Sequence, residues 1–252
     1  MVTDMSITSS RYQIDAVVFD CDGVLVDSET INNEVLAELA TEAGIPTTFE
    51  ECVARYMGRS TAECIAEIET SLGRAIEFDF AATYEERVFE RAGELRAVPG
   101  VAELLNWLDS LGVPRCVASS GTPTEIQHRL AVTQLAKHFG PYVFSATMVR
   151  RGKPAPDLFI YAADHLGVPP TKCLLVEDSP YGVRGGRAAG MRVVGFAALA
   201  SVESLMHAGA HFVVRSMAEL QAVLVVNDLI AASSGAQRSD AMRIATAARL
   251  PL

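Results

Sequence analysis

The 252-residue sequence lacks the features that mark exported, membrane-bound or nucleic-acid-binding proteins. It has no run of about 18 apolar residues that could span a bilayer, and residues 1–10 lack the apolar stretch of a secretory signal. The five cysteines are scattered without a C-x-x-C pair, which gives no sign of a zinc site or redox disulfide. Basic residues number 21 against 31 acidic ones, and the net charge of −10 repels polyanions. We therefore expect a cytoplasmic protein that binds neither membranes nor nucleic acid.

The sequence has the composition of a globular protein, since half of the residues are apolar and about a fifth are charged. A short apolar run at 15–20 ends in a polar turn, which is typical of a strand buried on both faces. Beyond residue 98, apolar runs alternate with helical stripes, and repeated βα units require a parallel sheet with helices on both faces. The sequence therefore predicts a doubly wound α/β fold. We expect further strands at 116–118, 142–144, 173–176, 192–196 and 211–214, and helices at 101–111, 124–130, 156–166 and 180–189.

A helical insertion interrupts this pattern directly after the first strand. Apolar residues recur at helical spacing between residues 28 and 91, and Gly44 is well placed to end the first of these helices. We therefore predict a core of residues 12–27 and 96–228 with a helical cap of residues 28–95. Residues 229–252 are rich in Ala, Ser and Arg with only weak helical spacing, and we expect a mobile tail of unknown role there.

Two carboxylates follow the first strand, in the segment Asp20-Cys-Asp22-Gly23. Residues two positions apart on an extended chain point the same way, so these side chains face one cleft roughly 6–7 Å apart along the backbone. Open α/β sheets bind their ligands at the C-terminal ends of the strands. Alternation points Cys21 away from the cleft, which favours a buried thiol over a catalytic one. Alone, a D-x-D pattern is more often a polar surface turn.

Three further polar signals lie at predicted strand ends. Ser119 and Ser120 follow the strand at 116–118, where a hydroxyl and free backbone N–H groups suit a phosphate, although a lone serine there would more often cap a helix. Lys153 precedes two prolines, and Glu177 with Asp178 follows the strand at 173–176. Each has an ordinary structural explanation by itself, but carboxylates, a hydroxyl and an ammonium on separate loops at one sheet edge together indicate an active site.

These residues resemble the haloacid-dehalogenase-like hydrolase superfamily. Its four motifs appear in family order as Asp20-Cys-Asp-Gly-Val-Leu25, Ser119, Lys153 within Gly-Lys-Pro-Ala-Pro156, and Glu177-Asp178-Ser-Pro180. The segment Asp27-Ser28-Glu29 and the insertion resemble the subfamily with a small helical cap, which includes β-phosphoglucomutase and sugar-phosphate phosphatases. The resemblance spans residues 15–224 and implies a Rossmann-like core with the cap inserted after the first strand. It also implies a monomer.

The resemblance assigns roles to the motif residues. It implies that Asp20 attacks phosphorus to form an aspartyl-phosphate and that Asp22 is the acid/base. Mg²⁺ is implied as cofactor, held by Asp20, Asp178 and the backbone carbonyl of Asp22, with Glu177 as a direct or outer contributor. Ser119, Ser120 and Lys153 would bind the phosphate. In the cap, Asn32 and Arg59 are the candidate substrate residues. The implied reaction is phosphatase action on a sugar phosphate or phosphorylated sugar acid.

Other functions remain to be weighed against this one. A β-phosphoglucomutase-type mutase is the nearest alternative, but Asn32 stands where that family carries a hinge histidine, and Thr61 replaces the arginine expected after Gly58. A 2-haloacid dehalogenase needs neither metal nor second aspartate, so Asp22 and Asp178 argue against it. A phosphonatase needs a cap lysine, and none occurs between residues 28 and 96. A catalytically silent binding protein would not require all four motifs.

Overall fold

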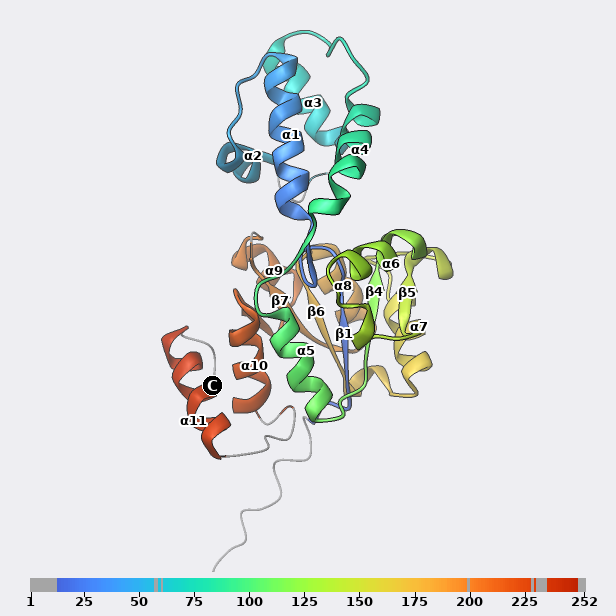
Figure 1. Ribbon diagram of the computed structural model, residues 1–252, viewed down its shortest axis with the longest axis vertical. Helices are drawn as coiled ribbons and strands as arrows, with labels where there is room; N and C mark the ends of the chain where they lie inside the picture. The colour runs from blue at the N-terminus through green and yellow to red at the C-terminus, as the bar shows by residue number, and fades with distance from the viewer. Residues whose placement is uncertain are drawn as a thin grey trace, which may run out of the picture.

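The computed structural model describes residues 13–56, 59, 61–198, 200–227, 229 and 235–248. These residues form an α/β core and a helical cap that stands above one end of it (Figure 1). Within the described ranges, none of the helices combines the length and apolar character needed to cross a membrane. Gly58 of the cap, after which β-phosphoglucomutases would carry an arginine, lies outside the described residues.

The core is a six-stranded parallel sheet in the order β5-β4-β1-β6-β7-β8. The predicted first strand is β1, and it lies in the middle with Phe19 opposite Val117 of β4 and Val176 of β6. All strands run the same way, so the ends of β1, β4 and β6 meet at one edge. The strand predicted at 211–214 is β8, which lies at one edge of the sheet. The strands are β1 Ala16–Phe19, β4 Arg115–Ser119, β5 Val143–Ser145, β6 Cys173–Glu177, β7 Arg192–Phe196 and β8 Phe212–Val214.

Helices cover both faces of the sheet, which explains why β1 is apolar throughout. Val17 and Phe19 join one buried cluster together with α5, α6 and α10. Ala16 and Val18 join the other cluster together with α7, α8 and α9. The doubly wound α/β fold predicted from the sequence is confirmed. The helices are α5 Val101–Ser110, α6 Pro123–Val132, α7 Asp157–Leu166, α8 Pro180–Ala188, α9 Val202–Ala208 and α10 Met217–Val226, with short 3-10 turns η3 Ala136–His138, η4 Ala146–Met148 and η5 Pro170–Lys172.

The cap has a buried apolar cluster of its own, built from all of its helices. Gly44 caps the C-terminal end of α1 with a positive φ of 114°, a backbone conformation that favours glycine. The sequence predicted this helix end. Arg87 of α4 and Arg91, the first residue of the following turn η2, pair with glutamates of α1. The helices are α1 Glu29–Ala43, α2 Phe49–Tyr56, α3 Thr61–Leu72 and α4 Phe80–Glu90, followed by the turn η2 Arg91–Glu94.

The chain enters and leaves the cap through one pair of short antiparallel strands. β2 is Val26–Asp27 and β3 is Arg96–Ala97, and Val26 lies opposite Ala97. Two-residue strands carry too little pattern for recognition from sequence, and we did not predict them. They bring the two ends of the cap together beside the end of β1.

The prediction of a mobile tail is wrong for residues 235–248. These residues include the helix α11 Gly235–Ala247, which packs beside α10 on the core (Figure 1). Ala241 and Ala245 are buried in the same cluster as α5 and α10. Their side chains are too small to give a strong hydrophobic stripe, so the spacing looked weak. Residues 230–234 and 249–252 lie outside the described residues.

Candidate active site

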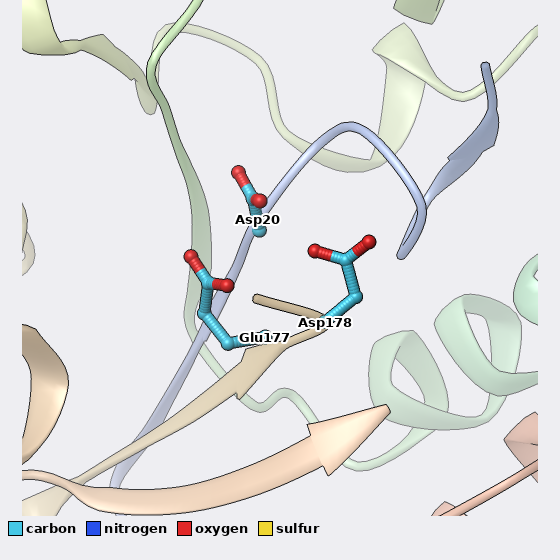
Figure 2. A group of neighbouring side chains, drawn as sticks. All are labelled: Asp20, Glu177 and Asp178. Carbon is cyan, nitrogen blue, oxygen red and sulfur yellow. The ribbon is translucent and has the colours of Figure 1, made fainter. Parts of the chain in front are cut away.

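Three carboxylates converge where β1 and β6 end. Asp20 follows β1, Glu177 is the last residue of β6, and Asp178 comes next. Figure 2 shows their side chains pointing toward one another, and each offers an oxygen within 4.8 Å of the others. Because β1 and β6 are neighbouring parallel strands, the register of the sheet itself brings these charges together.

Lys153 supplies the cation at this cluster, as its place before α7 suggested. Its ammonium lies 2.8 Å from Oδ1 of Asp20 and 2.5 Å from Oε1 of Glu177, and its side chain is 6% exposed. Burial alone would lower the pKa of Lys153, but the two carboxylates outweigh burial and raise it. The lysine is therefore charged at any physiological pH.

One ammonium does not balance the negative charge of this cluster. Burial raises the pKa of Asp20 to about 7 against the attraction of Lys153, with Glu177 adding to the rise. Burial, then Glu177 and Asp20, raise the pKa of Asp178 well above its ordinary value. The ammonium of Lys153 lies close to Oδ1 of Asp20, but this buried oxygen accepts no hydrogen bond. Hard oxygen donors with excess negative charge fit a small divalent cation such as Mg²⁺.

Asp22 lies beside the carboxylate cluster but faces different partners. Ser28 Oγ donates a hydrogen bond of 2.8 Å to Oδ1 of Asp22, and Arg129 Nη1 lies 2.8 Å from Oδ2. Both oxygens are thus held in place from two sides. Arg129 was missed from sequence because it sits within α6, 107 positions away in the chain, with no local signal. Only the fold brings it to the first motif.

The serines after β4 differ in their surroundings. Ser119 is 1% exposed, and its Oγ accepts a hydrogen bond of 3.2 Å from the N–H of Gly121. The helix that follows is capped by Thr122 in a capping box with Glu125, so the alternative that Ser119 is the helix cap is wrong. Ser120 is exposed. Ser119 is therefore free of a capping role and lies at the same sheet edge as Asp20.

Two glycines allow the carboxylates to approach the backbone. A Cβ on Gly23, which has a φ of +70°, would lie 1.9 Å from Oδ2 of Asp178. A Cβ on Gly182 in α8 would lie 1.8 Å from Oε1 of Glu177. Neither distance is compatible with a side chain, so both positions exclude any other residue without a shift of the acid cluster.

The cluster opens into a cleft of about 680 Å³ between core and cap. Both cap residues predicted to contact substrate, Asn32 and Arg59, line this cleft. Arg59 forms an ion pair with Glu67. Glu29 also lines the cleft and was not predicted as a substrate residue, because an acid in the first turn of a helix is usual. Burial, followed by Asp22, raises the pKa of Glu29.

The five cysteines are buried, and Cys64 alone among them lines the cleft. Cys21 is fully buried in the apolar cluster that includes residues of α5, and all five cysteines are buried without forming a disulfide. Burial, followed by Asp22 and Asp20, raises the pKa of Cys21 far above its ordinary value, which keeps it a neutral thiol. The interpretation of Cys21 as a buried apolar side chain is confirmed.

Comparison with known proteins places these features in a family. Residues 14–190 match the haloacid dehalogenase-like hydrolases. The chain is similar to the 6-phosphogluconate phosphatase of Escherichia coli K12, with 33% identity over 77% of this chain and 88% of that protein. It is also similar to hexitol phosphatase A of the same organism, with 33% identity over 70% of this chain and 80% of that protein. A HAD family hydrolase from Deinococcus radiodurans R1, solved with bound phosphate and sodium, superposes with a TM-score of 0.80 at 31% identity, covering 88% of this chain and all of that one.

Proposed function

The chain belongs to the haloacid dehalogenase-like hydrolases, and from this membership we propose that it is an Mg²⁺-dependent phosphatase of small phosphorylated metabolites, either sugar phosphates or phosphorylated sugar acids. The observation that carries the proposal is the buried group of Asp20, Glu177 and Asp178 with Lys153 among them. The phosphatase names of two similar proteins support the substrate class. The cytoplasmic location and the monomeric state stay predictions.

Asp20 is the proposed nucleophile. Its carboxylate attacks phosphorus, the bond to the alcohol oxygen breaks, and an aspartyl-phosphate forms. Asp22 gives its proton to the departing oxygen, then takes a proton from a water molecule that attacks the phosphorus. That second attack releases inorganic phosphate and restores Asp20. The contacts of Ser28 and Arg129 with both oxygens of Asp22 fix its position beside the nucleophile.

The remaining residues balance charge on the phosphoryl group. Lys153 neutralises part of the negative charge beside Asp20, and Ser119 with Ser120 offers donors to the phosphate oxygens. The residues that would hold Mg²⁺ are Asp20, Asp178 and the backbone carbonyl of Asp22, with Glu177 as a direct or outer contributor. When bound, Mg²⁺ would offset the repulsion between the carboxylates and the phosphoryl dianion.

A screen of phosphorylated metabolites tests this proposal. We expect Mg²⁺-dependent release of inorganic phosphate from at least one sugar or sugar-acid phosphate, and loss of release after chelation. Isomerised product formed faster than phosphate would instead establish the mutase alternative. Activity retained without metal would favour dehalogenase-like chemistry. Failure of the whole panel, with Mg²⁺ present, would leave the phosphatase proposal without support and favour the silent binding protein.

A further inference from the structure

The cleft has an unbalanced negative charge on the side where the alcohol part of a substrate must lie. Glu29, in the first turn of α1, lines this cleft together with Asp20, Asp22 and Asp178. Its side chain is half-buried, and the amide of Asn32 lies beside it, with Nδ2 3.5 Å from Oε1. An amide carries no net charge. Glu29 therefore presents a carboxyl group to the cleft with no cation beside it among the described residues.

The cations near the cleft are already engaged by other carboxylates. Lys153 contacts Asp20 and Glu177, and Arg129 contacts Asp22. Arg59, the one cationic side chain among the described residues lining the cleft, is paired with Glu67. Over the part of the chain that the structure describes, Glu29 has no ion-pair partner.

The polar groups around Glu29 suit hydroxyl groups. The amide of Asn32 and the side chains of Asn33 and Tyr84 line the same cleft. Asn33 is fixed, since its Nδ2 donates a hydrogen bond of 2.8 Å to the carbonyl of Glu29. A carboxylate accepts hydrogen bonds from several hydroxyls, and charge-assisted bonds of this kind are stronger than neutral ones. A second anion on the substrate would instead meet Glu29 at close range in a partly desolvated site.

We propose that Glu29 is a specificity-determining residue that selects phosphate monoesters of neutral polyhydroxyl alcohols over esters whose alcohol part carries a second acid. The inference rests on the proposed phosphatase function and narrows it, because that proposal admits sugar phosphates and phosphorylated sugar acids alike. The hydroxyls of the alcohol donate to Glu29, and a carboxylate or second phosphate is repelled.

Two substrates that differ at one carbon give a direct test. Glucitol 6-phosphate and 6-phosphogluconate have the same chain and phosphate position, but carbon 1 is a hydroxymethyl group in one and a carboxylate in the other. We expect kcat/KM to be at least about tenfold higher for glucitol 6-phosphate. In Glu29→Gln, which keeps the shape and removes the charge, this ratio should fall by about tenfold, chiefly through a lower KM for the acid.

A matched variant controls for the change in net charge. Glu86 lies exposed on α4, outside the lining of the cleft, so Glu86→Gln should leave the ratio unchanged. Dissociation constants of both esters, measured by calorimetry in the Asp20→Asn background with and without Glu29→Gln, should show the same shift without turnover. Circular dichroism and thermal melting report whether each variant is folded.

The outcomes separate this inference from the function on which it rests. A wild-type preference for 6-phosphogluconate, or a ratio unaffected by Glu29→Gln in both kinetics and calorimetry, would overturn the role of Glu29. Hydrolysis of acetyl phosphate with neither hexose derivative accepted would overturn the substrate class but keep the phosphatase chemistry. If acetyl phosphate is not hydrolysed either, the proposed function falls and the inference with it.

Discussion

Core and cap are each built on a buried apolar cluster, but they hold their charged side chains in different ways. In the core, Lys153 is 6% exposed and sits between carboxylates on neighbouring strands. In the cap, Arg59 is 47% exposed and pairs with Glu67 near the surface. A charge inside the core cannot move away without breaking the packing around it, whereas a charge on the cap can change partner at little cost.

This contrast separates two tasks. The core fixes a small number of charges at positions that the sheet dictates, which suits chemistry that is the same for every phosphate ester. The cap contributes polar side chains such as Glu29 and Asn32 to the lining of the cleft, where we propose that the variable part of the substrate binds. Substitutions in the core should therefore change the rate of every reaction or the stability of the fold. Substitutions in the cap should change which ester is accepted.

The largest effect should come from the proposed nucleophile. Asp20→Asn removes the attacking carboxylate, and we expect kcat to fall by at least about 10⁴-fold on every substrate while the protein stays folded. Phosphate release and circular dichroism measure the two parts. Asp15→Asn, at an exposed position at the opposite end of β1, serves as the control and should keep full activity. Unchanged turnover in Asp20→Asn would show that Asp20 is not the nucleophile.

Without metal, the free energy of unfolding should depend on pH, because the core buries carboxylates close to one another. The pKa of Asp20 is about 7 in the folded protein against an ordinary 3.8, so the folded state keeps a proton that the unfolded state has released. Stability without metal should therefore fall as pH rises between about 4 and 7, by about 4 kcal/mol in full. Urea unfolding with a chelator at pH 5 and pH 8 measures the decline, and Mg²⁺ should reduce it. Asp20→Asn should lose the part of this slope that Asp20 contributes, while Asp178, whose pKa is also raised, should retain the rest. An unchanged slope in that variant would assign the effect to groups other than Asp20.

Removing a cation from each region compares them directly. Lys153→Met leaves Asp20 and Glu177 buried without their ammonium, and we expect a loss of about 3 kcal/mol in unfolding free energy at pH 8 and a large loss of activity. Arg59→Met removes an exposed cation and should cost under about 1 kcal/mol. Urea titrations of both variants give the two values. Equal costs would show that burial does not distinguish core from cap charges.

The smallest effect should come from the outer ion pairs of the cap. Arg87 of α4 contacts Glu42 of α1 at 2.7 and 2.9 Å, with the arginine side chain 31% exposed. Arg87→Met should lower the unfolding free energy by about 0.5 kcal/mol at low salt, and by less at high salt because exposed charges are screened. Phosphate release should not change. A loss of activity as large as that of Lys153→Met would mean that cap stability limits the chemistry.

The sequence predicts those features that depend on residues close together in the chain, and it misses those that depend on contacts between distant residues. The strand at 15–20, its two aspartates and the acidic pair after 173–176 are local patterns, and parallel strands bring their ends together without further information. Arg129 could not be predicted, because its contact with Asp22 depends on how α6 packs. The strands β2 and β3 are two residues long, and α11 buries alanines, so neither produces a clear period.

The paired strands β2 and β3 have a consequence for how the two regions evolve. The two chain segments that connect core and cap lie side by side as β2 and β3. The cap is therefore equivalent to one loop inserted into the core, with its two ends held together. The entropy of closing a flexible loop grows only with the logarithm of its length, at about 0.6 kcal/mol per doubling. A differently sized helical bundle can therefore be grafted at the same two strands with little penalty to the sheet, so that new substrates become accessible while the phosphoryl chemistry beneath is inherited intact.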